Sequence, residues 1–189
     1  MAVDNKKRDS CSVTMKERSV RTTYAAVAED RFGMCIAINI EGEHAMVKIA
    51  VDAMGGDNAP GEIVAGAVMA AQSREDIQIF LIGKEEVVSE ELKKHTYKKE
   101  QIEVVNATEV IETEEPPVNA IRTKKDSSIV VGMNMVRRGE ADAFCSAGSS
   151  GAILVGGQVI VGRIKGVERP PLAPLIPTEK GVSLLIDCG

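Results

Sequence analysis

IAVDAMGGDNAP, residues 49–60, is the stretch from which the fold can be inferred. It continues a short apolar, β-branched run over Val47–Asp52, which is typical of an interior strand in a parallel sheet. Gly55-Gly56 then allows backbone angles and close approaches that side chains forbid. Asp57-Asn58 can cap a helix, and Pro60 suits its first turn. This order predicts a strand, a turn and a helix start that together can hold an anion, although a plain tight turn is the commoner outcome.

The composition favours an α/β protein with an aliphatic core. The chain has 189 residues, of which 44% are hydrophobic but only 3% are aromatic, and it has no tryptophan. A chain of this length can bury one real core. Because aromatic residues are scarce, a base-stacking nucleic-acid domain is disfavoured. The net charge of −5 also argues against bulk binding to nucleic acid or anionic lipid.

The cysteines and the hydropathy pattern indicate a cytoplasmic protein. The four cysteines are widely separated and form no CxxC pair, so neither a disulfide framework nor a zinc site is expected. No apolar run approaches the roughly 20 residues that span a bilayer. The charged N-terminus lacks the apolar stretch of a secretory signal. We expect no metal and no cofactor.

From Met46 onward, strand and helix patterns alternate. This alternation predicts a mostly parallel sheet with helices on both faces. Strands are expected over Val47–Asp52, Ile77–Gly83, Ile102–Asn106, Asp142–Ser146 and Val182–Asp187. Helices are expected over Glu62–Gln72, Lys84–His95, Val118–Lys124, from Ser127 or Ser128 to Gly139, and over Ala152–Arg163. The proline-rich segment 169–177 is expected to be extended chain.

Residues 1–45 do not show this alternation of strand and helix patterns, although Met34–Ile40 could form a strand. One hypothesis is that Met46 is the natural start, because Glu41-Gly42-Glu43 can be encoded by a purine-rich ribosome-binding sequence just upstream. The alternative is a native N-terminal extension. We therefore divide the chain into a doubtful prefix, 1–45, and an α/β domain, 46–189, that we expect to be truncated at its end.

Two further stretches have the chemistry of an anion site. Arg122, Lys124 and Lys125 stand just before a helix that Ser127 or Ser128 would cap, which suits phosphate, although a solvated charge run is commoner. The segment Ser146–Ala152 has only small residues after a strand, where α/β proteins bind ligands. It lacks the Gly-Lys-Ser/Thr of a Walker loop. Histidine stands only at positions 44 and 95, so a serine nucleophile with a histidine base is disfavoured.

Together these motifs resemble the bacterial phosphate acyltransferase family (PlsX). The resemblance covers residues 46–189 and leaves 1–45 unmatched. The matching motifs occur in order: Ile49–Pro60, Glu115–Pro117, Ala120–Arg122, Lys124–Ser128, Gly139–Ala143, Ser146–Gly148, Gly151-Ala152, Arg169-Pro170 and Leu185–Gly189. Ser149-Ser150 stands where the family usually has Asn-Thr, a change that keeps hydrogen-bonding groups.

The resemblance implies a fold, an activity and partners. The implied fold is Rossmann-like, similar to phosphotransacetylase and isopropylmalate dehydrogenase, and incomplete here because the family's members are longer. The implied reaction converts acyl-[acyl carrier protein] and inorganic phosphate to acyl phosphate for phospholipid synthesis, without a cofactor. The implied enzyme is a homodimer that associates peripherally with the membrane. A basic face would have to dock the acidic carrier protein, and the candidates are Arg137, Arg138, Arg163, Lys165 and Arg169.

The residue roles are inferred from side-chain chemistry rather than from the family. We assign catalysis to Asp57, Asn58 and Lys125. Substrate binding is assigned to the glycine and serine turns and to the remaining cations, namely Gly55, Gly56, Arg122, Lys124, Ser127, Ser128, Ser146, Gly148, Ser149 and Ser150.

Two alternatives remain open. One is a dehydrogenase of the same architecture, which is disfavoured because no GxGxxG follows a strand. The other is a non-catalytic fragment that binds acyl carrier protein.

Overall fold

In the part of the chain that the structure describes, the main sheet has five strands in the order β1-β5-β2-β3-β4. The computed structural model describes residues 34–37 and 46–185, except 169, 172, 174 and 180. The strands are β1 (Met34–Ala37), β2 (Val47–Asp52), β3 (Ile77–Gly83), β4 (Ile102–Asn106) and β5 (Ala143–Ser146). Strands β2 to β5 run parallel, and β1 is antiparallel to β5. The predicted, mostly parallel α/β sheet is confirmed.

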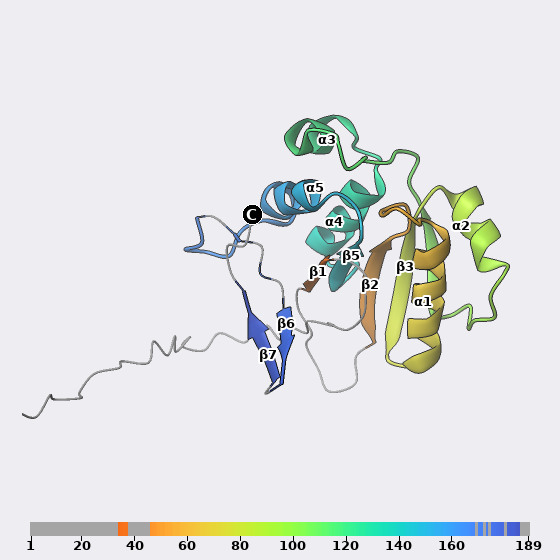
Figure 1. Cartoon of the computed structure of the whole chain (residues 1–189). Helices are drawn as coiled ribbons and strands as arrows, with labels where there is room; N and C mark the ends of the chain where they lie inside the picture. Colours follow the sequence, from red (N-terminus) through yellow and green to blue (C-terminus); the bar gives the residue numbers. More distant parts are fainter. Residues whose placement is uncertain are drawn as a thin grey trace, which may run out of the picture.

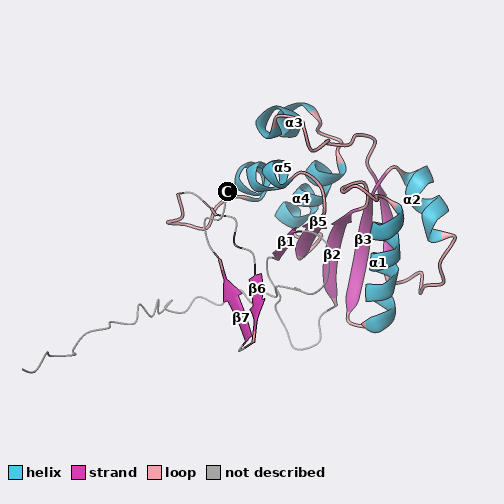
Figure 2. Ribbon diagram, viewed as in Figure 1, coloured by secondary structure: helices cyan, strands magenta, loops and turns pink. Residues whose placement is uncertain are grey.

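Helices cover both faces of this sheet, as predicted (Figures 1 and 2). Helices α1 (Gly61–Ser73) and α2 (Glu85–Leu92) pack on one face. Helices α4 (Ser128–Arg138) and α5 (Ser150–Gly156) pack on the other, with α3 (Pro117–Thr123) beside α5. The predicted bounds differ from these mainly at helix ends, where helices fray and capping competes with the last turn.

Strand β3 packs its side chains into two hydrophobic cores, one on each face of the sheet. Ile79 and Leu81 belong to the cluster beneath α1 and α2. Phe80 and Ile82 belong to the cluster beneath α4 and α5. Because successive side chains of a strand point to opposite faces, a continuous apolar run is what a strand covered on both sides requires.

Helix α4 lies close to the sheet because one of its residues has no side chain. A Cβ placed on Gly132 would lie 2.5 Å from a ring carbon of Phe144 and 2.9 Å from Cδ1 of Ile82. Ser127 is the N-cap of this helix, and its Oγ accepts a hydrogen bond from the Val130 N–H. Gly139 ends the helix with a φ of 72°. Both ends therefore use the capping residues that the sequence indicated.

The single helix predicted over Ala152–Arg163 is wrong in its second half. The α-helical part ends at Gly156, and Gly157–Val161 continues as a π-helix, η1. A Cβ on Gly156 would lie 2.3 Å from the sulfur of Met133 on α4. Consecutive glycines have low helix propensity, so packing against α4 can override the regular α-helical pattern here.

A separate two-stranded sheet contains β6 (Leu175–Thr178) and β7 (Gly181–Leu184). The first of these falls partly in the segment predicted to be extended chain. The second overlaps the predicted strand over Val182–Asp187, of which residues 186 and 187 lie outside the described residues. Part of the segment assigned to the prefix, Met34–Ala37, forms the edge strand β1.

Candidate functional site

The ends of β2 and β5 bring two polar side chains together. Asp52 ends β2 and Ser146 ends β5, and the two strands are parallel neighbours in which Val51 is paired with Cys145. The Ser146 Oγ donates a hydrogen bond of 2.7 Å to Oδ2 of Asp52. Both side chains are buried. The carboxyl edge of a parallel sheet, where such proteins bind ligands, thus has a carboxylate and a hydroxyl in contact.

Each of these side chains also holds the backbone of the turn that follows it. The Met54 N–H donates to Oδ1 of Asp52 over 3.0 Å. The Gly148 N–H donates to Oγ of Ser146, also over 3.0 Å. Because the two side chains are bonded to each other, the two turns form one connected network.

The turns themselves are in direct contact, which explains their glycines. A Cβ on Gly55 would lie 2.4 Å from Oδ2 of Asp52 and 2.8 Å from the backbone nitrogen of Gly148. A Cβ on Gly148 would lie 3.3 Å from the Gly55 Cα. Gly56 has a φ of 105°, which residues with side chains rarely adopt. A side chain at Gly55 would overlap Asp52 and the Gly148 backbone, and one at Gly148 would be tightly packed.

Asp52 stands in an environment that opposes its ionisation. Burial raises the pKa of the Asp52 carboxyl above 3.8, while hydrogen bonds from Ser128, Ser146 and the backbone of the turn partly offset the effect of burial. Ser128 is the first residue of α4, so three elements meet at this carboxylate: β2, β5 and α4. Burial disfavours the charged form, whereas donors to the carboxylate favour it.

The basic segment before α4 is tied to the loop after β4. Lys124 Nζ forms an ion pair with Glu115 and donates to the Val110 carbonyl over 2.6 Å. Lys125 Nζ donates to the Ile121 carbonyl over 3.0 Å. Arg122 is exposed. The three predicted cations therefore differ: one is paired with a carboxylate, one is bound to a backbone carbonyl, and one is in solvent.

The predicted serines divide into caps, a buried contact and an exposed residue. Ser127 and Ser149 accept hydrogen bonds from the first turns of α4 and α5. Ser128 is buried against Asp52. Ser150 is exposed at the start of α5. Three of these four hydroxyls thus form contacts within the protein, and only the Ser150 hydroxyl is exposed.

Asp57 and Asn58 are exposed in the turn between β2 and α1. The Asn58 backbone carbonyl accepts a hydrogen bond from the Glu62 N–H, which starts α1. The site thus joins Gly55, Ser128, Ser146 and Gly148 around Asp52, while Asp57 and Asn58 lie in the exposed turn that leads into α1.

Comparison with known proteins identifies a family that includes the residues of this site. Residues 47–189 match the family described as "Fatty acid synthesis protein". The chain belongs to this family. Proteins named "Phosphate acyltransferase" from Clostridium beijerinckii and Alkaliphilus oremlandii are 51% and 52% identical to it over 143 residues. The aligned part is 76% of this chain but 43% and 42% of those proteins, so the chain spans less than half the length of the curated relatives it matches.

Sequence reasoning missed Asp52 as a site residue of this chain. The sequence pattern indicates only that Asp52 ends a strand. One signal was present: a carboxylate at the end of an otherwise apolar interior strand has to be paired, hydrogen-bonded or protonated. A buried carboxylate just before a glycine turn is therefore worth singling out in a sequence.

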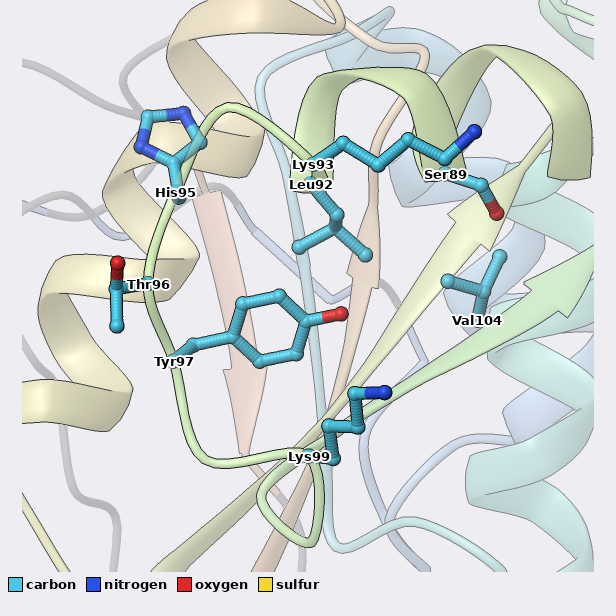
Figure 3. Close-up of a pocket in the computed structure, with 8 residues that line it drawn as sticks. All are labelled: Ser89, Leu92, Lys93, His95, Thr96, Tyr97, Lys99 and Val104. Atoms are coloured by element: carbon cyan, nitrogen blue, oxygen red, sulfur yellow. The ribbon is translucent and has the colours of Figure 1, made fainter.

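A pocket of about 470 Å³ lies elsewhere, beside α2 and the edge strand β4 (Figure 3). Leu92, Tyr97 and Val104 provide its apolar surface, and Lys93 and Lys99 lie at its margin. It shares no residue with the site around Asp52. Among the described residues, no cluster of His, Cys, Asp and Glu could hold a metal ion. In that same part of the chain, no helix has the length and apolar character needed to cross a bilayer.

Proposed function

We propose that this chain provides part of the site of a phosphate acyltransferase, which transfers an acyl group from acyl carrier protein to inorganic phosphate. The family match and the printed name of the relatives support acyl transfer. The observation that carries the proposal is the contact between the Gly55 and Gly148 turns at the carboxyl ends of β2 and β5. Two glycine-containing turns at this edge allow an anion to approach backbone N–H groups closely.

The reaction that we propose needs positioning and charge stabilisation rather than a redox group. A phosphate oxygen attacks the thioester carbonyl carbon, and the carbonyl oxygen becomes a tetrahedral oxyanion. When this intermediate collapses, the carbon–sulfur bond breaks, the carrier thiolate leaves and takes up a proton, and acyl phosphate remains. Backbone N–H groups aimed at the oxyanion would supply the main stabilisation.

The cations and exposed polar residues have proposed roles beside this site. Lys125 and Arg122 would offset the charge of phosphate, because neither is paired with a carboxylate among the described contacts. Lys124 would act more indirectly, since it is paired with Glu115. Asp57 and Asn58 stand in the exposed turn next to Gly56, where they would contact the incoming substrate.

The partners are also proposals. Acyl carrier protein would supply the acyl group, and the acyl phosphate would enter phospholipid synthesis. A homodimer with peripheral membrane association, in the cytoplasm, is the assembly that we propose. Of the basic residues suggested for carrier docking, Arg137, Arg138, Arg163 and Lys165 are exposed, and Arg169 lies outside the described residues.

Hydroxylamine trapping tests the activity directly, because it converts acyl phosphate to a hydroxamate. Acyl carrier protein loaded with a fatty acyl group and phosphate are incubated with this chain, and with a version extended past Gly189 by the remainder of the Clostridium beijerinckii relative. We expect phosphate-dependent hydroxamate from the extended version. The relative itself is the positive control. If that control is active and the folded extended version is not, the proposed function is wrong, and carrier binding without turnover would favour a non-catalytic role.

A further inference from the structure

Asp52 is a buried carboxylate whose described partners are hydroxyl and N–H groups rather than a cation. It is 1% exposed, and its contacts come from Ser146, Ser128 and the backbone of its own turn. Burying a carboxylate is costly, and well-packed apolar residues often replace buried charges without loss of stability. Stability is therefore a poor explanation for a carboxylate here, and orientation of its neighbours is a better one.

The two oxygens of Asp52 hold the two turns separately. Oδ1 accepts the Met54 N–H, which belongs to the turn after β2. Oδ2 accepts the Ser146 hydroxyl, whose oxygen in turn accepts the Gly148 N–H of the turn after β5. A serine hydroxyl has one proton. Because that proton is given to Asp52, the Ser146 oxygen presents its lone pairs to Gly148.

We propose that Asp52 is a positioning residue for acyl transfer, which through Ser146 holds the Gly148 turn at a fixed spacing from the Gly55 turn. This inference rests on the proposed function. Donors that stabilise an oxyanion work only if they are oriented before the charge develops. The Cβ position of Gly55 faces both Oδ2 of Asp52 and the backbone of Gly148, so the carboxylate lies where the two turns meet. The carboxylate thus acts on the reaction through the backbone that it orients.

Three substitutions separate this role from simple packing. Ser146→Ala removes the connection between Asp52 and Gly148 and leaves the carboxylate in place. Asp52→Asn keeps the size of the side chain but replaces one of its two acceptor oxygens with an NH₂ group, which can only donate. Ser146→Thr restores a hydroxyl at the same position. Gln101→Leu is the matched control, because Gln101 is buried and donates to the carbonyls of Arg74 and Ile77, near the opposite ends of the strands.

The test measures kcat and KM for phosphate and for acyl carrier protein in the extended version, together with the free energy of unfolding. We expect Ser146→Ala and Asp52→Asn to lower kcat on the order of tenfold to a hundredfold, as loss of an orienting partner typically does. The KM for acyl carrier protein should stay unchanged. Ser146→Thr should recover most of the activity, and Gln101→Leu should lower stability without changing kcat.

The outcomes distinguish this inference from the function on which it rests. If the wild-type extended version is active, and Asp52→Asn and Ser146→Ala are destabilised like Gln101→Leu yet keep the wild-type kcat, Asp52 is only structural and the proposed function stands. Failure of Ser146→Thr to recover activity in a folded protein would also overturn the role given to the hydroxyl. An inactive, folded wild-type extended version beside an active relative would overturn both.

A second measurement needs no turnover. In this chain, amide hydrogen exchange at Gly148 should be faster in Ser146→Ala than in the wild type, while exchange at Leu81 in the core of β3 stays slow. Equal protection of Gly148 in both proteins would show that the hydroxyl does not hold this turn.

Discussion

At the scale of single residues, burial decides what Asp52 can do. Asp57, in the turn that follows, is exposed to solvent. Asp52, at the end of β2, is enclosed by β5 and α4, and its hydrogen bonds replace the water that it has lost. The resulting balance between desolvation and hydrogen bonding makes its ionisation sensitive to folding.

The pKa of Asp52 predicts a particular pH dependence of stability. Because burial raises the pKa of this carboxyl in the folded state, the folded protein holds its proton above pH 3.8, where the unfolded chain has begun to release it. The contribution to stability is fully present below that value and is lost as the pH rises through the folded pKa. We expect the unfolding free energy of the wild type, relative to Asp52→Asn, to fall with rising pH.

Urea unfolding followed by circular dichroism at a series of pH values measures this difference, since the chain has no tryptophan for fluorescence. Exposed carboxylates with a lowered pKa, such as Asp126, make the free energy of unfolding rise with pH. Their effect is the same in the wild type and in Asp52→Asn, so it cancels in the difference. Parallel curves for wild type and variant would contradict the prediction.

Two glycines should respond in opposite ways to the same change. Gly55→Ala places a methyl group 2.4 Å from Oδ2 of Asp52, so it should lower the free energy of unfolding by about 1–3 kcal/mol. Gly66→Ala lies in the middle of α1 with no neighbouring atom within 4 Å. It should raise stability by about 0.5–1 kcal/mol, because alanine restricts the unfolded chain and favours the helix.

Thermal and urea unfolding of these two variants give both values. If Gly55→Ala were as stable as the wild type, the two turns would not be in the close contact described.

At the scale of elements, the charged residues between α3 and α4 have two kinds of role. Lys124 and Asp126 hold the connection in place, whereas Lys125 is proposed to bind phosphate. Lys124 links this connection to Glu115 and to the carbonyl of Val110 in the loop after β4. Asp126 links it to Thr108 in the same loop. The position of α4, and therefore of Ser128 against Asp52, depends on these contacts.

Lys124 and Lys125 are therefore expected to differ when they are changed singly. Lys125→Ala should raise the KM for phosphate about tenfold, the size of one lost charge-assisted hydrogen bond, with little change in Tm. Lys124→Ala should lower the Tm, because it leaves Glu115 without its cation. The double change should combine both effects.

The measurement is the phosphate dependence of hydroxamate formation in the extended version, with the Tm of each variant. An unchanged phosphate dependence in the double variant would refute the role of these lysines.

At the scale of the whole molecule, the chain is acidic overall but has exposed cations in the last turn of α4 and after η1. The net charge is −5, while Arg137 and Arg163 are exposed in these two places. An acidic carrier protein would be repelled by the average charge and attracted only by a local basic surface. Docking that depends on such a surface is weakened by salt.

We expect acyl carrier protein to bind the extended version more weakly as salt is raised, mainly through slower association. Arg137→Glu and Arg163→Glu should weaken binding further, on the order of tenfold for the pair. Lys98→Glu, which removes an exposed cation that is paired with Glu75, is the matched control. Titration by fluorescence anisotropy with labelled carrier protein provides the affinities, and binding insensitive to salt would exclude this surface.

The sequence by itself determined most of the elements, and the family, of this protein. Apolar β-branched runs separated by amphipathic segments indicated β2, β3 and β4 with their observed bounds, because hydrophobic periodicity and capping are local signals. The glycine turns and the motifs around them indicated the family that the comparison shows. Local signals also identified Ser127 as a possible cap and Gly139 as a helix end.

Only the tertiary structure decided what Asp52 contacts. Its partner Ser146 stands 94 residues away, and the two meet because β5 lies beside β2 in the sheet. Strand order in a parallel sheet depends on crossovers and on packing of distant helices, which no local pattern encodes. The same holds for Lys124, whose pairing with Glu115 follows from the path of the loop around α3. The sequence specifies the type of each side chain. The surroundings of that side chain, and therefore its pKa and its role, depend on the folded structure.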